Sequence, residues 1–161
     1  MNRAKKGLGV IIVLAPVIFV AHFLEESPGF VSWFNEHVRN GITQGLFWKV
    51  NISALVITII VMLIELFEPS MVSTSLVVLW FSFLMLANAI FHITGAIVDQ
   101  RYMPGLITAV ILYLPYYSFV IFRSLRKGRL NTALGIFLAI LGSSLMLVHG
   151  YLIIFRGSRL F

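Results

Sequence analysis

The chain has 161 residues, of which 60% are hydrophobic and 11% are charged, and its formal net charge is +6. A soluble globular domain has roughly 25% charged residues, so this composition excludes an ordinary soluble protein and indicates a polytopic membrane protein. The chain has no cysteine, which excludes disulfides, thiolate metal sites and cysteine nucleophiles.

Five apolar stretches approach or exceed the roughly 20 residues of helix needed to cross a bilayer. The expected spans are residues 8–26, 46–67, 71–98, 106–122 and 130–155. Pro16 lies inside the first span, where a proline can kink a helix. Residues 30–39 follow the Ser27-Pro28-Gly29 break and have apolar side chains at helical spacing, which predicts a short amphipathic helix in the membrane interface. The predicted fold is therefore all-α: a polytopic membrane helical bundle of five transmembrane helices plus a short interfacial helix, with residues 1–161 in a single integral membrane domain.

The basic residues predict an orientation. Seven lysine and arginine residues fall in the N-terminal segment and in the loop after the fourth span, against five on the other side of the bundle. Because cytoplasmic loops are enriched in these residues, the N-terminus is expected in the cytoplasm. The Arg126-Lys127-Gly128-Arg129 loop is interpreted as a topogenic signal, and the net charge as matched to anionic lipid headgroups rather than to nucleic acid.

The first span ends in the sequence His22-Phe23-Leu24-Glu25-Glu26. Glu25 and Glu26 follow His22 by three and four residues, which places all three side chains on one side of a helix. Ionisable groups at the edge of a hydrocarbon layer are costly to keep there, so they are candidates for a functional site.

Polar residues on three other spans are expected at the same depth as His22. Asn51, His92 and His149 lie roughly 6–10 Å below the outer surface at a rise of 1.5 Å per residue, and Asn88 lies one turn below His92. Three imidazoles with one or two carboxylates match a site for a divalent metal, with zinc favoured over iron. The expected ligands are His22, Glu25, His92 and His149, with Asn51 and Asn88 orienting them. Glu26 is the expected general base on metal-bound water, although the order of the two glutamates is left open.

The motif from His22 to Glu26 resembles that of a family of small bacterial integral membrane proteins named for it, the HXXEE family. Asn51, Asn88, His92 and the Tyr102-Met103-Pro104-Gly105 segment are similar to further family marks, and the resemblance extends over about residues 15–149. The resemblance implies a helical membrane domain in the bacterial inner membrane and a candidate site, but no reaction. The sequence itself has no GxSxG, P-loop, HExxH or Rossmann fingerprint.

The leading functional hypothesis is a membrane-embedded, metal-dependent hydrolase acting on an amphipathic or lipid-like substrate near the outer face. Arg101 and Tyr102, in the adjacent loop, are expected to bind a polar headgroup. The alternatives are a metal or proton transporter or small-ligand binder, a two-iron oxidoreductase, and an accessory subunit whose polar cluster fixes helix packing. Almost wholly apolar helices below His92 and His149 favour a one-sided pocket over a transport path. The lipid bilayer is the expected partner and nucleic acid is not, and both a monomer and a homo-oligomer are compatible with the sequence.

Overall fold

The structure is a computed structural model that describes residues 8–160, and these residues form helices and connecting loops without a strand. The elements in chain order are η1 (Val10–Val13), α1 (Leu14–Glu26), α2 (Phe30–His37), α3 (Gln44–Phe67), α4 (Met71–Phe81), η2 (Ser82–Ala87), α5 (Asn88–Asp99), α6 (Leu106–Thr108), η3 (Ala109–Tyr113), α7 (Leu114–Arg126) and α8 (Thr132–Arg156).

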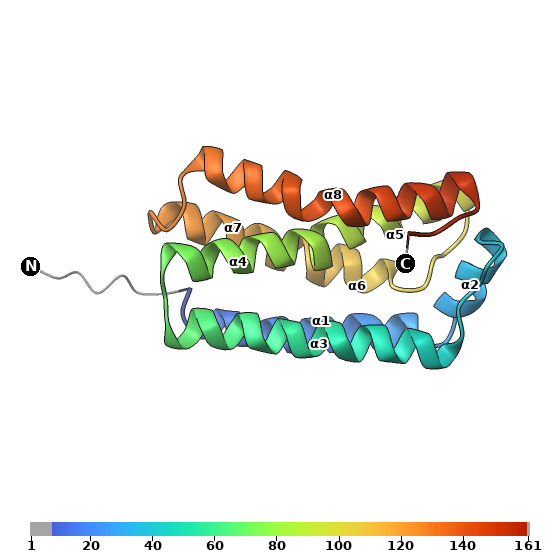
Figure 1. Ribbon diagram of the computed structural model, residues 1–161, viewed down its shortest axis with the longest axis horizontal. Coiled ribbons are helices and arrows are strands. Elements are labelled where there is room, and N and C mark those ends of the chain that lie inside the picture. The colour runs from blue at the N-terminus through green and yellow to red at the C-terminus, as the bar shows by residue number, and fades with distance from the viewer. Residues whose placement is uncertain (1–7, 161) are drawn as a thin grey trace, which may run out of the picture.

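Several of these elements join into long apolar spans. Four segments are long and apolar enough to cross a membrane: Gln44–Phe67, Met71–Asp99, Leu106–Arg126 and Thr132–Arg156. Val10–Glu26 and Phe30–His37 (α2) meet the same criterion only together, as one broken span bent by 65°, so the described residues contain four spans, or five if this bent pair is counted as one. In Figure 1, α1 runs alongside α3, while α2 turns across the end of the bundle. The predicted helical membrane bundle with a short accessory helix is confirmed.

Local sequence signals set the helix ends. The side chains of Thr43, Ser70 and Asn131 each accept a backbone N–H in the first turn of α3, α4 and α8, respectively. Gly157 adopts the left-handed conformation that ends α8. Pro16 lies in the first turn of α1, directly after the 3-10 segment η1. A proline is tolerated at this position because N–H groups in the first turn have no acceptor within the α-helix.

Two spans contain π-helical segments, η2 in the third and η3 in the fourth. Pro115 follows η3 closely and lacks the N–H of a regular helix, which favours a local change of hydrogen-bonding pattern there. Each extra residue in a π-turn rotates the following side chains around the helix axis, and such bulges are frequent at functional sites. Here η2 ends immediately before Asn88, one helical turn ahead of His92, and η3 begins immediately after Thr108.

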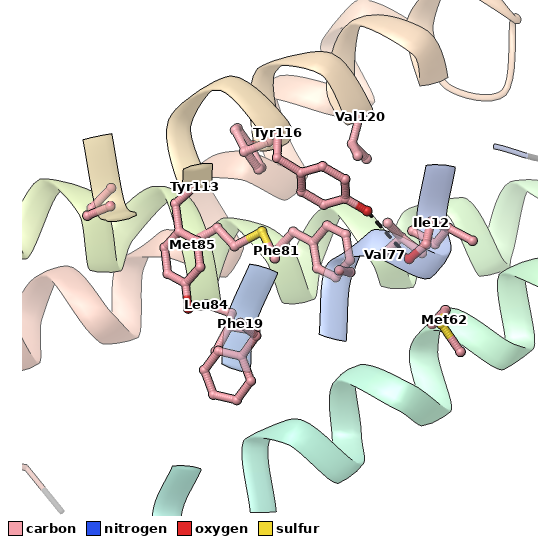
Figure 2. Packing of buried hydrophobic residues seen from close by; sticks show 14 of the residues in the cluster. Ile12, Phe19, Met62, Val77, Phe81, Leu84, Met85, Tyr113, Tyr116 and Val120 are labelled. Atoms are coloured by element: carbon pink, nitrogen blue, oxygen red, sulfur yellow. Dashed lines mark hydrogen bonds between the residues drawn. The ribbon is translucent and has the colours of Figure 1, made fainter. Parts of the chain in front are cut away.

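An apolar core fills the centre of the bundle. Phe81, Met85 and Tyr113 are fully buried there, and the Tyr116 hydroxyl donates to the backbone carbonyl of Ile12 at 3.5 Å (Figure 2). The core draws on α1, α4, η2, η3 and α7, so it ties the first span to the third and fourth.

A buried polar cluster lies where the α3–α4 turn and the α7–α8 loop meet. Arg129, which belongs to the loop interpreted as a topogenic signal, is 3% exposed and pairs with Glu65 at 3.4 Å. The Glu65 carboxylate also accepts from the backbone of Leu8 at 3.0 Å and from the hydroxyls of Ser73 and Thr74 at 2.5 and 3.0 Å. The burial of Arg129 and Glu65 is tolerated because hydrogen-bonding groups surround this charge pair.

Candidate metal centre

The end of α1 and the middle of α5 bring three ionisable side chains together. His22 and Glu26 lie one helical turn apart on α1, and His92 faces them from α5. Their potential ligand atoms all lie within 4.8 Å of one another. His22 is 1% exposed, His92 0% and Glu26 5%, so the cluster is shielded from solvent on almost every side.

The spacing of these atoms suits a small metal ion. The Nε2 atoms of His22 and His92 lie 3.5 and 3.0 Å from Oε1 of Glu26. Ligands at 2.0–2.1 Å from a tetrahedral zinc ion are separated from each other by about 3.3 Å. Neither Nε2 atom is aligned for a hydrogen bond with any partner in the described part of the chain. Two imidazole nitrogens and one carboxylate oxygen therefore surround a common point without forming hydrogen bonds to one another.

A hydrogen-bonded chain fixes the tautomer of His22. Thr108 donates its hydroxyl hydrogen to Oε2 of Glu25 at 2.5 Å, and the Thr108 hydroxyl oxygen itself lies 2.8 Å from Nδ1 of His22. Because the hydroxyl hydrogen is already used, Nδ1 of His22 must be the donor in that contact. The lone pair of the neutral ring is then on Nε2, the atom that faces Glu26 and His92.

Close packing holds the two imidazoles. The His22 ring lies 4.1 Å from that of Tyr113 and 5.0 Å from that of His92, measured between centroids. Gly105 packs directly on the cluster, because a Cβ atom there would lie 2.6 Å from Cε1 of His92 and 2.9 Å from Cγ of Glu26. Gly105 also has a φ of 95°, so both its conformation and its surroundings require glycine.

The surroundings of the two glutamates differ from what their expected roles require. Glu25 was expected to be a metal ligand and Glu26 the general base. Glu25 turns away from the imidazoles and accepts from the backbone N–H groups of Ile107 and Thr108 at 3.0 and 2.8 Å. Tyr102 also donates to Glu25, at 2.5 Å. The carboxylate thus caps the start of the fourth span, where the helix dipole favours a negative charge. Adjacent helical residues diverge by about 100°, so only Glu26 can face His92.

His149 stands apart from the three-residue cluster although it lies at the expected depth on α8. It is buried, and its Nδ1 accepts from the backbone N–H of Leu160 at 3.2 Å. His149 lines the same cavity as His22 and Glu26, a space of about 380 Å³. The expected convergence therefore holds for His22 and His92, whereas His149 contributes to the wall of the adjoining cavity.

Asn51 and Asn88 also line this cavity, but neither contacts an imidazole through a hydrogen bond within the described chain. The Asn51 amide donates to the backbone carbonyl of Phe47 at 3.0 Å. The buried Oδ1 of Asn88 has no hydrogen-bond partner among the described residues. Thr108, which sequence reasoning did not single out, occupies the orienting position expected for these asparagines.

The expected headgroup residues are engaged with neighbours. Arg101 pairs with Glu36 and lies 3.6 Å from Asp99. Tyr102 donates to Glu25, and burial together with this carboxylate raises the pKa of Tyr102 to about 12. Neither residue lines the cavity. Sequence reasoning also missed Arg159, which does line it, because only the path of the C-terminal segment brings it there.

The chain matches a known protein family. The sequence model described as "Protein of unknown function with HXXEE motif" matches residues 13–120, which include the motif, His92 and Thr108. No curated protein and no solved structure matches the chain.

Proposed function

The chain belongs to the HXXEE family, and we propose that the motif for which the family is named builds the metal centre of a membrane-embedded hydrolase that acts on an amphipathic substrate. His22, Glu26 and His92 are the proposed ligands, and zinc is the favoured ion. Two histidines and one glutamate are the protein ligands of several catalytic zinc sites, which leave the fourth position for water or substrate.

One observation carries this proposal: the Nε2 atoms of His22 and His92 are buried, lack hydrogen bonds within the described chain and converge on one carboxylate oxygen. Leaving buried polar atoms unsatisfied costs about 1–3 kcal/mol each, and a bound cation would remove that cost. The chain from Glu25 through Thr108 to His22 provides the support for the second ring nitrogen that metal-binding histidines commonly have.

The adjoining cavity supports an amphipathic substrate. Its wall contains phenylalanine and aliphatic side chains together with a few polar groups, and its volume of about 380 Å³ is within the range of small-molecule sites. A bound zinc ion would supply a hydroxide near neutral pH by lowering the pKa of its water to about 7. Because Glu26 is among the proposed ligands and Glu25 caps a helix, neither glutamate is free to act as the general base.

The packing favours a one-sided pocket over a transport path. The apolar core lies between the metal centre and the polar cluster of Glu65 and Arg129, whose groups are bonded to one another. We further propose that the N-terminus is cytoplasmic, in a bacterial inner membrane, so that the metal centre lies toward the outer face.

The experiment is metal analysis of purified protein combined with an activity assay. One zinc per chain is expected in wild type and its loss in His22→Ala and His92→Ala, while His149→Ala is the matched control because it removes a cavity histidine outside the cluster. Hydrolysis of single-chain fluorogenic esters should disappear with chelator and return with zinc. Equal metal content in all four proteins would overturn the metal centre, and a fully loaded protein without hydrolytic activity would overturn the reaction.

A further inference from the structure

A basic side chain lies in the wall of the cavity beside the proposed metal centre. Arg159 lines this cavity together with His22, Glu26 and His149. Of the described residues that line it, Arg159 is the one lysine or arginine and Glu26 the one carboxylate. The other lining residues are mainly apolar, so a cationic group here is unusual and needs a reason.

Backbone contacts bring Arg159 to this position. After the left-handed turn at Gly157, the chain folds back from the end of α8 toward the middle of the bundle (Figure 1). Ser158 donates its backbone N–H to Leu152 at 3.2 Å, and Leu160 donates to His149 at 3.2 Å. The residues on both sides of Arg159 are therefore bonded to α8, which limits where its side chain can reach.

The guanidinium has no carboxylate partner within the described chain. The ion pairs of the described residues use Glu26, Glu36, Glu65 and Asp99, and none includes Arg159. If a divalent metal is bound by neutral imidazoles and by Glu26, the centre keeps one net positive charge, and Arg159 adds a second. An anionic ligand would compensate both charges in a low-dielectric cavity.

We infer that the cavity binds a single-chain amphiphile whose headgroup is a phosphate, an inference that rests on the proposed hydrolase function. Arg159 binds the phosphate oxygens on the side away from the metal centre, since guanidinium presents paired donors to such groups. The alkyl chain lies along the apolar wall formed by residues such as Phe30, Phe47 and Phe83. A phosphate ester suits both the cationic cavity and the proposed hydrolase, because it carries negative charge and has a bond that can be hydrolysed. A free carboxylate carries the charge but has no such bond.

The test measures binding to the full-length, zinc-loaded protein in a neutral detergent. The probes are decyl phosphate, decanol and inorganic phosphate, which separate the contributions of the chain and of the anion. The proteins are wild type, Arg159→Ala, Arg159→Lys and Arg156→Ala, the last being a matched control because Arg156 is exposed and does not line the cavity. Metal content is measured in each preparation.

Wild type should prefer decyl phosphate over both other probes, and Arg159→Ala should weaken that binding at least about tenfold without changing decanol binding. Arg159→Lys should restore part of the loss, and Arg156→Ala should match wild type. Equal binding of decyl phosphate by wild type and Arg159→Ala would overturn the inference, as would inorganic phosphate binding as tightly as decyl phosphate. A metal-free wild type that still shows the Arg159 effect would overturn the metal centre but support the phosphate site.

Discussion

Replacing Thr108 with valine should weaken metal binding without unfolding the bundle. Valine keeps the shape of threonine but removes the hydroxyl that accepts from His22 at 2.8 Å and donates to Glu25 at 2.5 Å. The imidazole N–H is then buried without an acceptor, and Nε2 is no longer the favoured position of the lone pair.

Two routes give the same magnitude for this loss. Removing a group that orients a metal-bound histidine typically costs 10–100-fold in affinity, which is about 1.4–2.7 kcal/mol. Leaving one buried donor unsatisfied costs about 1–3 kcal/mol. Metal affinity is measured by competition with a chelator of known zinc affinity, and a decrease of about 10–100-fold is expected.

Two variants control for trivial explanations. Thr108→Ser keeps the hydroxyl and should bind zinc nearly as wild type does. Thr58→Val removes another buried threonine hydroxyl, one that accepts from Trp80 at 2.9 Å, and should leave zinc affinity unchanged. Because Glu25 acts through the same hydroxyl, Glu25→Gln combined with Thr108→Val should lose less affinity than the two single changes added together. Wild-type zinc affinity in Thr108→Val would refute the orienting chain.

Three further predictions concern the surroundings of the site. Gly105→Ala should abolish zinc binding, because its Cβ would overlap an imidazole, whereas Gly128→Ala, also at positive φ but with no atom within 4 Å, should retain it in the same metal assay. Arg129→Met should leave the Glu65 carboxylate unpaired and lower the free energy of unfolding by about 3–5 kcal/mol, measured by denaturation in detergent, with zinc content unchanged. Tyr102 should stabilise the fold relative to Tyr102→Phe below about pH 10, the ordinary phenol pKa, and this difference should disappear as the pH rises through its folded pKa of about 12; a difference in unfolding free energy that does not change with pH would contradict it.

The sequence predicts the bundle well because membrane spans depend on length and composition, which do not require tertiary information. The rise per residue also places His22 and His92 at one level, and the structure brings them together. Depth alone does not give the direction of a side chain around its helix. His149 has the right depth, but its Nδ1 accepts from the backbone of Leu160, and its ring lies outside the cluster of His22, Glu26 and His92.

The assignments of Glu25 and Glu26 required information from another span. Their helical positions differ by about 100°, so either could face the histidines until the rotation of α1 is known. That rotation places Glu25 at the start of the fourth span, where the backbone of Ile107 and Thr108 accommodates a carboxylate. The π-helical segments η2 and η3 change the phase of their spans as well, and no simple periodicity in the sequence reveals them.

The two buried polar clusters of the bundle differ in whether their polar atoms have hydrogen-bond partners in the protein. Both oxygens of Glu65 accept hydrogen bonds, and Arg129 donates to protein oxygens from each of its three nitrogens. Nothing more is required there than helix packing. At the other end, Glu26 and the two imidazole Nε2 atoms lie close together without hydrogen bonds between them, and a cavity adjoins them. Because burial without partners is costly, this difference is the reason to propose a bound ligand at the histidine cluster and a purely structural role for the pair of Glu65 and Arg129.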